Sequence, residues 1–191
     1  MRAIFLMTLA ALISQLMGCT TAVVGGAATG AAVIHDRRTA PTMLEDQAIE
    51  IKTLKLQLDH PELSEHSNIS VTSYNLKVLL TGEADTQAIS DRFAELVSNI
   101  QRVERVHNEV VVSPSGTLLD QTNDAYLTSK VKLELLRIDG KSFDPTRVKV
   151  VTSQGTVFLM GIISPSDARK VVEKVRFIAG VKRVVKVFEY Y

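Results

Sequence analysis

The chain has a single cysteine, Cys19, in 191 residues, so the sequence excludes an intrachain disulfide. Its N-terminal apolar stretch, from Ala3 to Ile13, is too short to cross a bilayer, which takes about 20 residues. The sequence also lacks a G-x-S-x-G elbow, a P-loop and a dinucleotide fingerprint. No close metal-ligand spacing joins the four histidines, which are His35, His60, His66 and His107. We therefore expect neither an enzyme nor a bound cofactor or metal.

The N-terminus has the layout of a secretory signal, because Arg2 precedes the apolar stretch and the junction Leu16-Met17-Gly18-Cys19 follows it. This junction resembles the lipobox of bacterial lipoproteins. The resemblance implies that residues 1–18 are removed and that Cys19 carries acyl chains, palmitate among them, as the membrane anchor. Thr20 is not the aspartate of the retention signal, so the resemblance favours the periplasmic face of the outer membrane. The alternative is an ordinary buried or free cysteine, and a free thiol is a liability in an oxidising compartment.

Residues 19–42 are rich in Thr, Ala, Gly and Val and contain no aromatic residue. Such a segment buries too little apolar surface to offset its ordering entropy. We expect a lipidated N-terminus followed by a flexible tether. Val23 and Val24 offer an alternative, in which part of the segment packs along the bilayer surface.

The remaining chain repeats itself. Ile69 to Gly82 aligns with Val148 to Gly161 at a spacing of 79 positions, and Ile49 aligns with Leu127 at 78. A period this long indicates two copies of a small domain rather than a solenoid. We place the first copy at 43–113, a linker at 114–121 and the second copy at 122–191.

Each copy is expected to be α+β, with the order αββαβ and a three-stranded mixed sheet covered by two helices. In the first copy, hydrophobic periodicity and the alignment with the second predict helices over 45–58 and 86–100 and strands over 69–73, 77–82 and 106–112. In the second copy they predict helices over 123–138 and 165–178 and strands over 148–152, 156–161 and 184–190.

Caps and turns are predicted from local residue types. Asp46 and either Asn123 or Asp124 are available as helix caps. The pairs Tyr74-Asn75 and Gln154-Gly155 are expected to form the hairpin turns.

The motif Val157-Phe-Leu159-Met-Gly161, followed by Gly180-Val181-Lys-Arg-Val184, resembles the BON domain. Arg102 replaces the corresponding glycine of the first copy, so the turn there is expected to differ. The chain is similar to the tandem BON-domain lipoproteins of Gram-negative outer membranes. That resemblance implies a non-enzymatic phospholipid-binding protein that supports outer-membrane integrity, gathers at the cell division site and contacts lipid through its second domain.

Charge separates the two copies. Residues 46–113 contain 6 Lys and Arg against 11 Asp and Glu, a net charge of −5, whereas residues 124–191 contain 13 against 7, a net of +6. Each Lys or Arg near an anionic membrane contributes about 1 kcal/mol of attraction. The second copy therefore suits phosphatidylglycerol or cardiolipin head groups. The alternative is a basic face that is merely solvated or that contacts the first copy. Nucleic acid is not expected as a partner of an exported, tethered chain.

The first helix of the second copy is expected to carry two apolar stripes. Leu127, Val131, Leu135 and Ile138 fall on one side at 100° per residue. The roughly opposite side is expected to contact lipid, and its residues are Tyr126, Lys130, Leu133, Leu136 and Arg137. An apolar stripe bordered by cations and carrying a tyrosine is typical of interfacial membrane helices. Two alternatives remain: this face buries against the first copy, or it docks an envelope protein such as an outer-membrane assembly or cell-division component.

Overall fold

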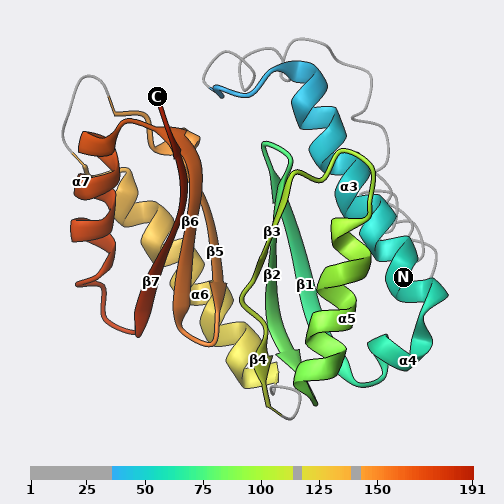
Figure 1. Ribbon diagram of the computed structural model, residues 1–191. Coiled ribbons are helices and arrows are strands. Elements are labelled where there is room, and N and C mark those ends of the chain that lie inside the picture. Colours follow the sequence, from blue (N-terminus) through green and yellow to red (C-terminus); the bar gives the residue numbers. More distant parts are fainter. Residues whose placement is uncertain (1–35, 114–117, 139–142) are drawn as a thin grey trace, which may run out of the picture. The chain divides into compact units, whose positions relative to one another are not determined.

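The computed structural model describes residues 36–113, 118–138 and 143–191 (Figure 1). The predicted signal peptide, Cys19 and the tether as far as residue 35 lie outside the described residues. The first copy consists of α3 (Ala40–Asp59), α4 (Pro61–Ser64), β1 (Ser67–Tyr74), β2 (Lys77–Ala84), α5 (Gln87–Ser98), β3 (Arg105–Asn108) and β4 (Val111–Val112). The second consists of α6 (Leu118–Leu135), the 3-10 helix η1 (Pro145–Arg147), β5 (Lys149–Ser153), β6 (Thr156–Ile163), α7 (Pro165–Val175) and β7 (Arg183–Tyr190). Both copies follow the predicted αββαβ order, with α4 and η1 as short additions.

Both sheets are mixed, as predicted, and the middle strand pairs differently on its two sides. β2 is antiparallel to β1 and parallel to β3 and β4, which together form one interrupted edge strand. β6 is likewise antiparallel to β5 and parallel to β7. The interruption falls at residues 109–110, inside the strand predicted over 106–112.

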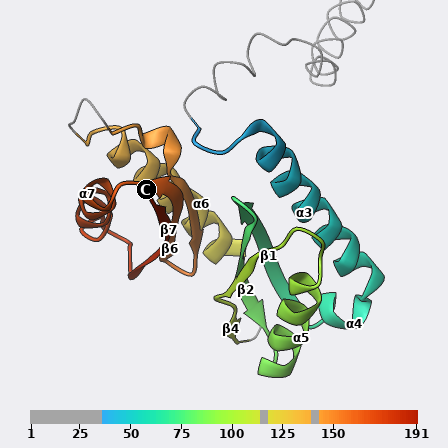
Figure 2. The ribbon, with the colours of Figure 1, turned by 45° about the horizontal axis from the view of Figure 1, so that its top comes forward.

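Two helices cover one face of each sheet (Figure 2). In the first copy, Ile49 of α3 and Phe93 of α5 pack against Val78 and Leu80 of β2. In the second copy the buried core contains the predicted stripe of α6, and its main members are Leu127, Val131, Leu135, Val157, Leu159, Val171 and Val175.

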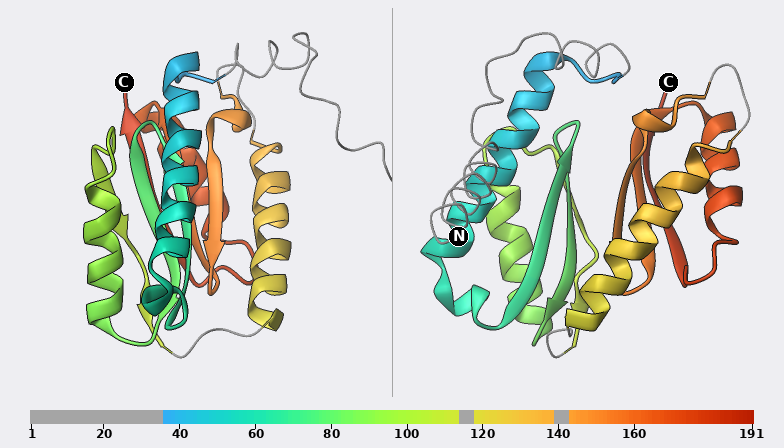
Figure 3. Two further views of the ribbon diagram at one scale, coloured as in Figure 1. Left: turned by 90° about the vertical axis from the view of Figure 1, so that its right-hand side faces the viewer. Right: turned by 180° about the vertical axis from the view of Figure 1, so that it is seen from behind.

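The other faces of the two sheets contact each other (Figure 3). Tyr74 and Leu79 of the first copy form one buried cluster with Phe158, Met160 and Val187 of the second. This contact explains why the middle strands are apolar on both faces, a pattern found in strands that are buried on both sides. The second face of each sheet therefore contacts the other copy rather than solvent.

Ion pairs also join the copies, and they are Lys77–Glu189, Lys149–Glu50 and Arg183–Glu109. In two of the three, the acid comes from the acidic first copy and the base from the basic second copy. Part of the charge difference between the copies is thus used in their contact with each other.

The hairpin turn of the first copy differs from its prediction by one residue. Tyr74 pairs with Lys77, so Asn75 and Leu76 form the turn, with φ of 52° and 63°. The buried carboxylate of Asp46 accepts hydrogen bonds from the backbone N–H groups of Asn75 at 2.8 Å and Leu76 at 2.9 Å. Asp46 is therefore not a helix cap: the N-cap of α3 is Thr39, whose side chain accepts from the N–H of Thr42.

The second copy repeats this arrangement. The turn is Gln154-Gly155, as predicted, and its two N–H groups donate to Asp124 at 2.6 and 2.8 Å. Asp124 lies inside α6, so it does not cap that helix either. In each copy one aspartate of the first helix therefore fixes the hairpin turn.

The turn at Arg102 does not differ from its counterpart, contrary to expectation. Arg102 has a φ of 76° and Gly180 a φ of 103°, so both adopt a left-handed backbone conformation. A non-glycine residue rarely occupies that region, and such strain costs on the order of 1–3 kcal/mol. The turn is thus kept in the first copy at an energetic cost.

The first helices begin earlier than predicted. α3 starts at Ala40 rather than near residue 45, and α6 starts at Leu118 rather than near 123. Residues 40–42, predicted as the end of the tether, are therefore helical. The segment before α3 is also held in place: Arg38 lies over the ring of Tyr74 at 4.0 Å, and Arg37 lies over the ring of Tyr191 at 3.6 Å.

Candidate functional site

The outer face of α6 carries the predicted apolar stripe. Tyr126, Leu133 and Leu136 are between 59% and 68% exposed, whereas Leu127 and Val131 on the inner face are buried. The alternative in which this outer face buries against the first copy is wrong, because these three side chains stay exposed although the two copies are in contact. The stripe is thus available for a ligand or partner.

The two predicted cations of this face already have protein partners. The ammonium group of Lys130 donates to the carbonyl of Ala179 at 3.0 Å. Arg137 forms an ion pair with Glu134 of the same helix. Lys174 of α7 pairs with the other oxygen of Glu134 at 3.0 Å, and this hydrogen bond, with the charge of Arg137, lowers the pKa of Glu134. Lys130 and Arg137 border the stripe as predicted, but each already interacts with another group of the protein.

Phe177, just beyond α7, extends the exposed apolar surface and was missed by the sequence analysis. Its side chain is 74% exposed, and the guanidinium of Arg176 lies 4.6 Å from the centre of its ring. A pocket of about 450 Å³ between α6 and α7 is lined by Phe177 together with Lys130 and Glu134. The signal was present in the sequence, because Phe177 falls off the core stripe of Val171 and Val175 on a helical projection.

A second pocket lies beside the beginning of α6. It has a volume of about 560 Å³, and Tyr126, Gly180 and Lys182 are among its lining residues. Lys182 is exposed, and its aliphatic chain passes close to Gly155. The stripe of α6 therefore adjoins the segment after α7, and together they form one surface of apolar and basic side chains.

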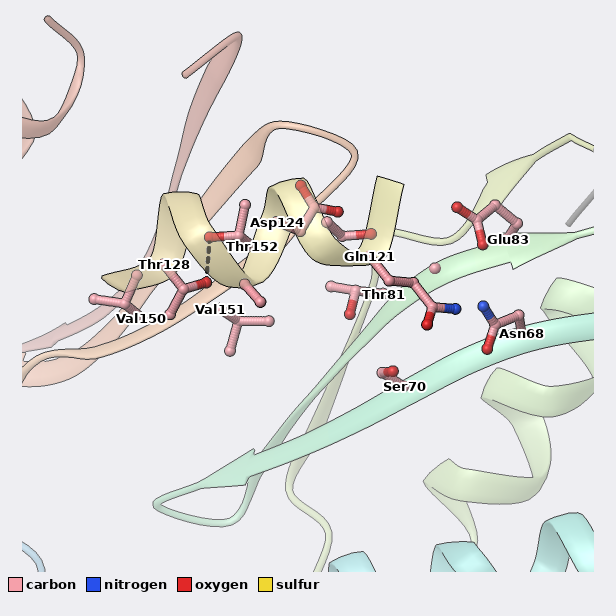
Figure 4. A pocket seen from close by; sticks show the side chains of 13 residues that line it. Asn68, Ser70, Thr81, Glu83, Gln121, Asp124, Thr128, Val150, Val151 and Thr152 are labelled. Carbon is pink, nitrogen blue, oxygen red and sulfur yellow. Dashed lines mark hydrogen bonds between the residues drawn. The ribbon is translucent and has the colours of Figure 1, made fainter. Parts of the chain in front are cut away.

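Figure 4 shows a third pocket, which lies between the strands of the first copy and α6 with β5 of the second. Its volume is about 470 Å³, and Ser70, Thr81, Thr128 and Thr152 line it with neutral hydroxyls. Its carboxylates are occupied: Asp124 holds the hairpin turn, and Glu83 accepts from the amide of Gln154. The pocket therefore offers hydrogen bonding but no catalytic pair.

The histidines within the described ranges form isolated contacts. His60 meets Glu62 at 2.9 Å and His66 meets Asp85 at 3.0 Å, both on the surface. Burial, with the charge of Arg105, lowers the pKa of His107. Over residues 36–113, 118–138 and 143–191, no group of three His, Cys, Asp or Glu side chains could hold a metal ion. Helices α3 to α7, the ones that the structure describes, include none with the length and apolar character needed to span a membrane.

The family model of the BON domain matches residues 46–114 and 123–190, and the chain belongs to this family. It is 34% identical to the outer membrane lipoprotein DolP of Haemophilus influenzae, over 92% of this chain and 90% of that protein. It is also 32% identical to a 21 kDa hemolysin of Actinobacillus pleuropneumoniae, over 81% of this chain and 79% of that protein. The osmotically-inducible protein Y of Escherichia coli is 28% identical over 74% of this chain and 70% of that protein.

The chain is thus a dual BON-domain protein, and it is similar over most of its length to the outer membrane lipoprotein DolP.

Proposed function

We propose that this lipoprotein is not an enzyme and that its second BON domain binds anionic phospholipid, phosphatidylglycerol or cardiolipin, in support of outer-membrane integrity. The observation that carries the proposal is the exposed stripe of Tyr126, Leu133 and Leu136 on a helix whose other stripe is already buried in the core. A surface helix normally needs only one apolar stripe, so the second one is available for a membrane interface.

The chemistry of the surface suits the head-group region of a bilayer. Tyr126 combines an apolar ring with a polar hydroxyl, and Phe177 adds an aromatic side chain nearby. Burying one leucine or phenylalanine side chain fully contributes about 1.5–3 kcal/mol. Lys130 and Lys182 place positive charge along the same surface, where each contributes about 1 kcal/mol near anionic lipid. The charge of Lys174 is offset by its ion pair with Glu134.

The proposed anchor is Cys19. Its acyl chains give stable attachment, and the helix contact then acts at a high effective concentration. Metabolic labelling with a fatty acid should tag the protein, and Cys19→Ala should abolish the label. A label that survives this substitution rejects Cys19 as the lipidated residue.

Sedimentation with vesicles tests the lipid contact. The protein used is the chain 20–191. An isolated second copy would expose the apolar sheet face around Phe158, and lipid binding through that face would obscure the contribution of α6. Leu133→Glu should weaken binding to phosphatidylglycerol vesicles by about tenfold or more, because 1.4 kcal/mol is a factor of ten. Ser166→Glu changes the net charge of the same copy equally at an exposed position of α7, and it should leave binding nearly unchanged.

The rival function is an interaction module that docks an outer-membrane assembly or cell-division component on the same exposed stripe. Binding that requires anionic lipid and weakens with salt supports lipid recognition, because salt screens exposed charges. Absence of vesicle binding, together with a stoichiometric protein crosslink from position 133, would establish the rival.

A further inference from the structure

The first copy has its own exposed apolar stripe, on α3. Leu44, Ile51, Leu54 and Leu58 are between 58% and 74% exposed. They project to the side of α3 opposite the buried residue Ile49. The proposed lipid contact does not use this stripe, and the net charge of −5 on the first copy opposes an anionic bilayer.

The stripe has the spacing of a coiled-coil seam. Leu44, Ile51 and Leu58 recur at intervals of seven and occupy the a positions, while Gln47 and Leu54 occupy the d positions. A repeat of seven keeps the apolar seam facing a neighbouring helix along its length. The geometry therefore fits another helix of the same repeat better than a flat lipid surface.

We propose that this seam pairs with the same seam of a second copy of the chain, forming a parallel homodimer through α3. A parallel pair is compatible with the proposed lipid anchor, because both chains are then attached to the same membrane. The N-terminus of α3 is the end nearer Cys19 in the sequence, and just before it Arg38 is fixed by Asp46 at 2.8 Å and by the ring of Tyr74. The predicted tether leaves the direction of the two helices open, so the flanking charges decide it.

The flanking charges select the parallel arrangement. Glu50 occupies a g position and Lys55 the following e position. In a parallel pair a g residue faces the e residue five positions later on the other helix, so Glu50 faces Lys55 of the second copy and the reverse. The intrachain contacts of Glu50, with the N–H of Ser73 and with Lys149, are both made by Oε1. An antiparallel pair would bring together residues of like charge instead.

The size of the seam indicates a weak dimer that depends on the membrane. Each helix contributes five a and d positions between Leu44 and Leu58, whereas standard stable interfaces use roughly 20–30 residues on each side. Anchoring both chains in one membrane raises their effective concentration and favours pairing. The dimer is expected in the membrane and not in dilute solution.

Cysteine crosslinking of the full-length lipidated protein in its membrane tests this arrangement. Leu44→Cys and Leu58→Cys mark the two ends of the seam, and Lys52→Cys is the matched control at an exposed position outside the seam. A disulfide requires Cα atoms about 4.4–6.8 Å apart. Leu44→Cys alone and Leu58→Cys alone should each give a crosslinked dimer, and Lys52→Cys should not.

Disrupting the seam completes the test. In the Leu58→Cys background, Ile51→Glu should abolish the dimer, with circular dichroism confirming that the exposed substitution leaves the fold intact. Lys55→Glu keeps the apolar seam but places Glu opposite Glu50, so it should reduce the yield. Unchanged yields in both variants would overturn the proposal. Equal crosslinking of the Lys52→Cys control, or crosslinks to other proteins only, would also overturn it. Dimers that form only between a Leu44→Cys chain and a Leu58→Cys chain would indicate an antiparallel pair and would overturn it as well.

Discussion

The first helices of the two copies, α3 and α6, hold the same place in the fold but present different outer faces. Each packs its inner face on a mixed sheet and fixes a hairpin turn through one aspartate, Asp46 or Asp124. The outer face of α3 carries four aliphatic side chains at coiled-coil spacing, whereas that of α6 carries a tyrosine and two leucines bordered by cations. Duplication thus kept the residues that build the domain and left the outer face of each helix free to acquire a separate contact.

The largest expected effect tests the shared part of this comparison. Asp46 is 3% exposed and accepts from Ser73 Oγ, from the N–H groups of Asn75 and Leu76, and from Arg38. Asp46→Ala leaves the hydroxyl of Ser73 and the N–H groups of Asn75 and Leu76 without their acceptor, whereas Arg38 keeps its ion pair with Asp36. It should lower the free energy of unfolding by about 3–5 kcal/mol, because each buried donor left unpaired costs about 1–3 kcal/mol.

Asp124→Ala is the matched variant in the second copy, where the known acceptor contacts are two backbone N–H groups. It should cost less, about 1–3 kcal/mol. Urea denaturation followed by circular dichroism measures both values. Equal losses would mean that the two aspartates contribute alike, and that Arg38 adds nothing to the first copy.

Part of this fold and of the candidate site could be predicted from local sequence patterns, and part depends on tertiary contacts. Periodicity and the internal repeat were sufficient for the αββαβ order, the inner stripe of α6 and its exposed outer stripe. The pairing of Glu134 with both Arg137 and Lys174 depends on how α7 lies against α6, which no local pattern specifies. The one-residue error at the Asn75-Leu76 turn has a different cause, because residue types favoured Tyr74-Asn75 while the bonds to Asp46 decided the register.

Phe177 offers a sharper test of the difference between the outer faces. Its counterpart in the first copy, at a spacing of 78, is Asn99, which is also exposed. Phe177→Ser should weaken binding of the 20–191 chain to phosphatidylglycerol vesicles by about tenfold, the lower end of what a buried aromatic contributes. Asn99→Phe should bring no gain, because its copy carries a net charge of −5. A gain from Asn99→Phe would show that an exposed aromatic alone drives binding, whichever copy carries it.

The smallest expected effect is a change in the pH dependence of stability, and it arises at the equivalent edge strands β3 and β7. His107 of β3 pairs in register with Leu79, and its counterpart at a spacing of 78 is Val185 of β7, which packs against the cluster between the copies. Burial first, and then the charge of Arg105, lowers the pKa of His107 below its ordinary value of 6.5. The unfolded chain therefore binds a proton more readily, and His107 is expected to reduce stability as the pH falls below about 6.5.

His107→Val should flatten this part of the stability profile, since valine already occupies the equivalent position of the second copy. The measurement is the urea midpoint of the wild-type and variant chains between about pH 7.5 and 5.5, on either side of the ordinary histidine pKa. We expect the wild-type midpoint to fall over this window by more than that of the variant. Parallel profiles would mean that protonation of His107 is not coupled to the contact between the two sheets, and that the edge strands differ only in their side chains.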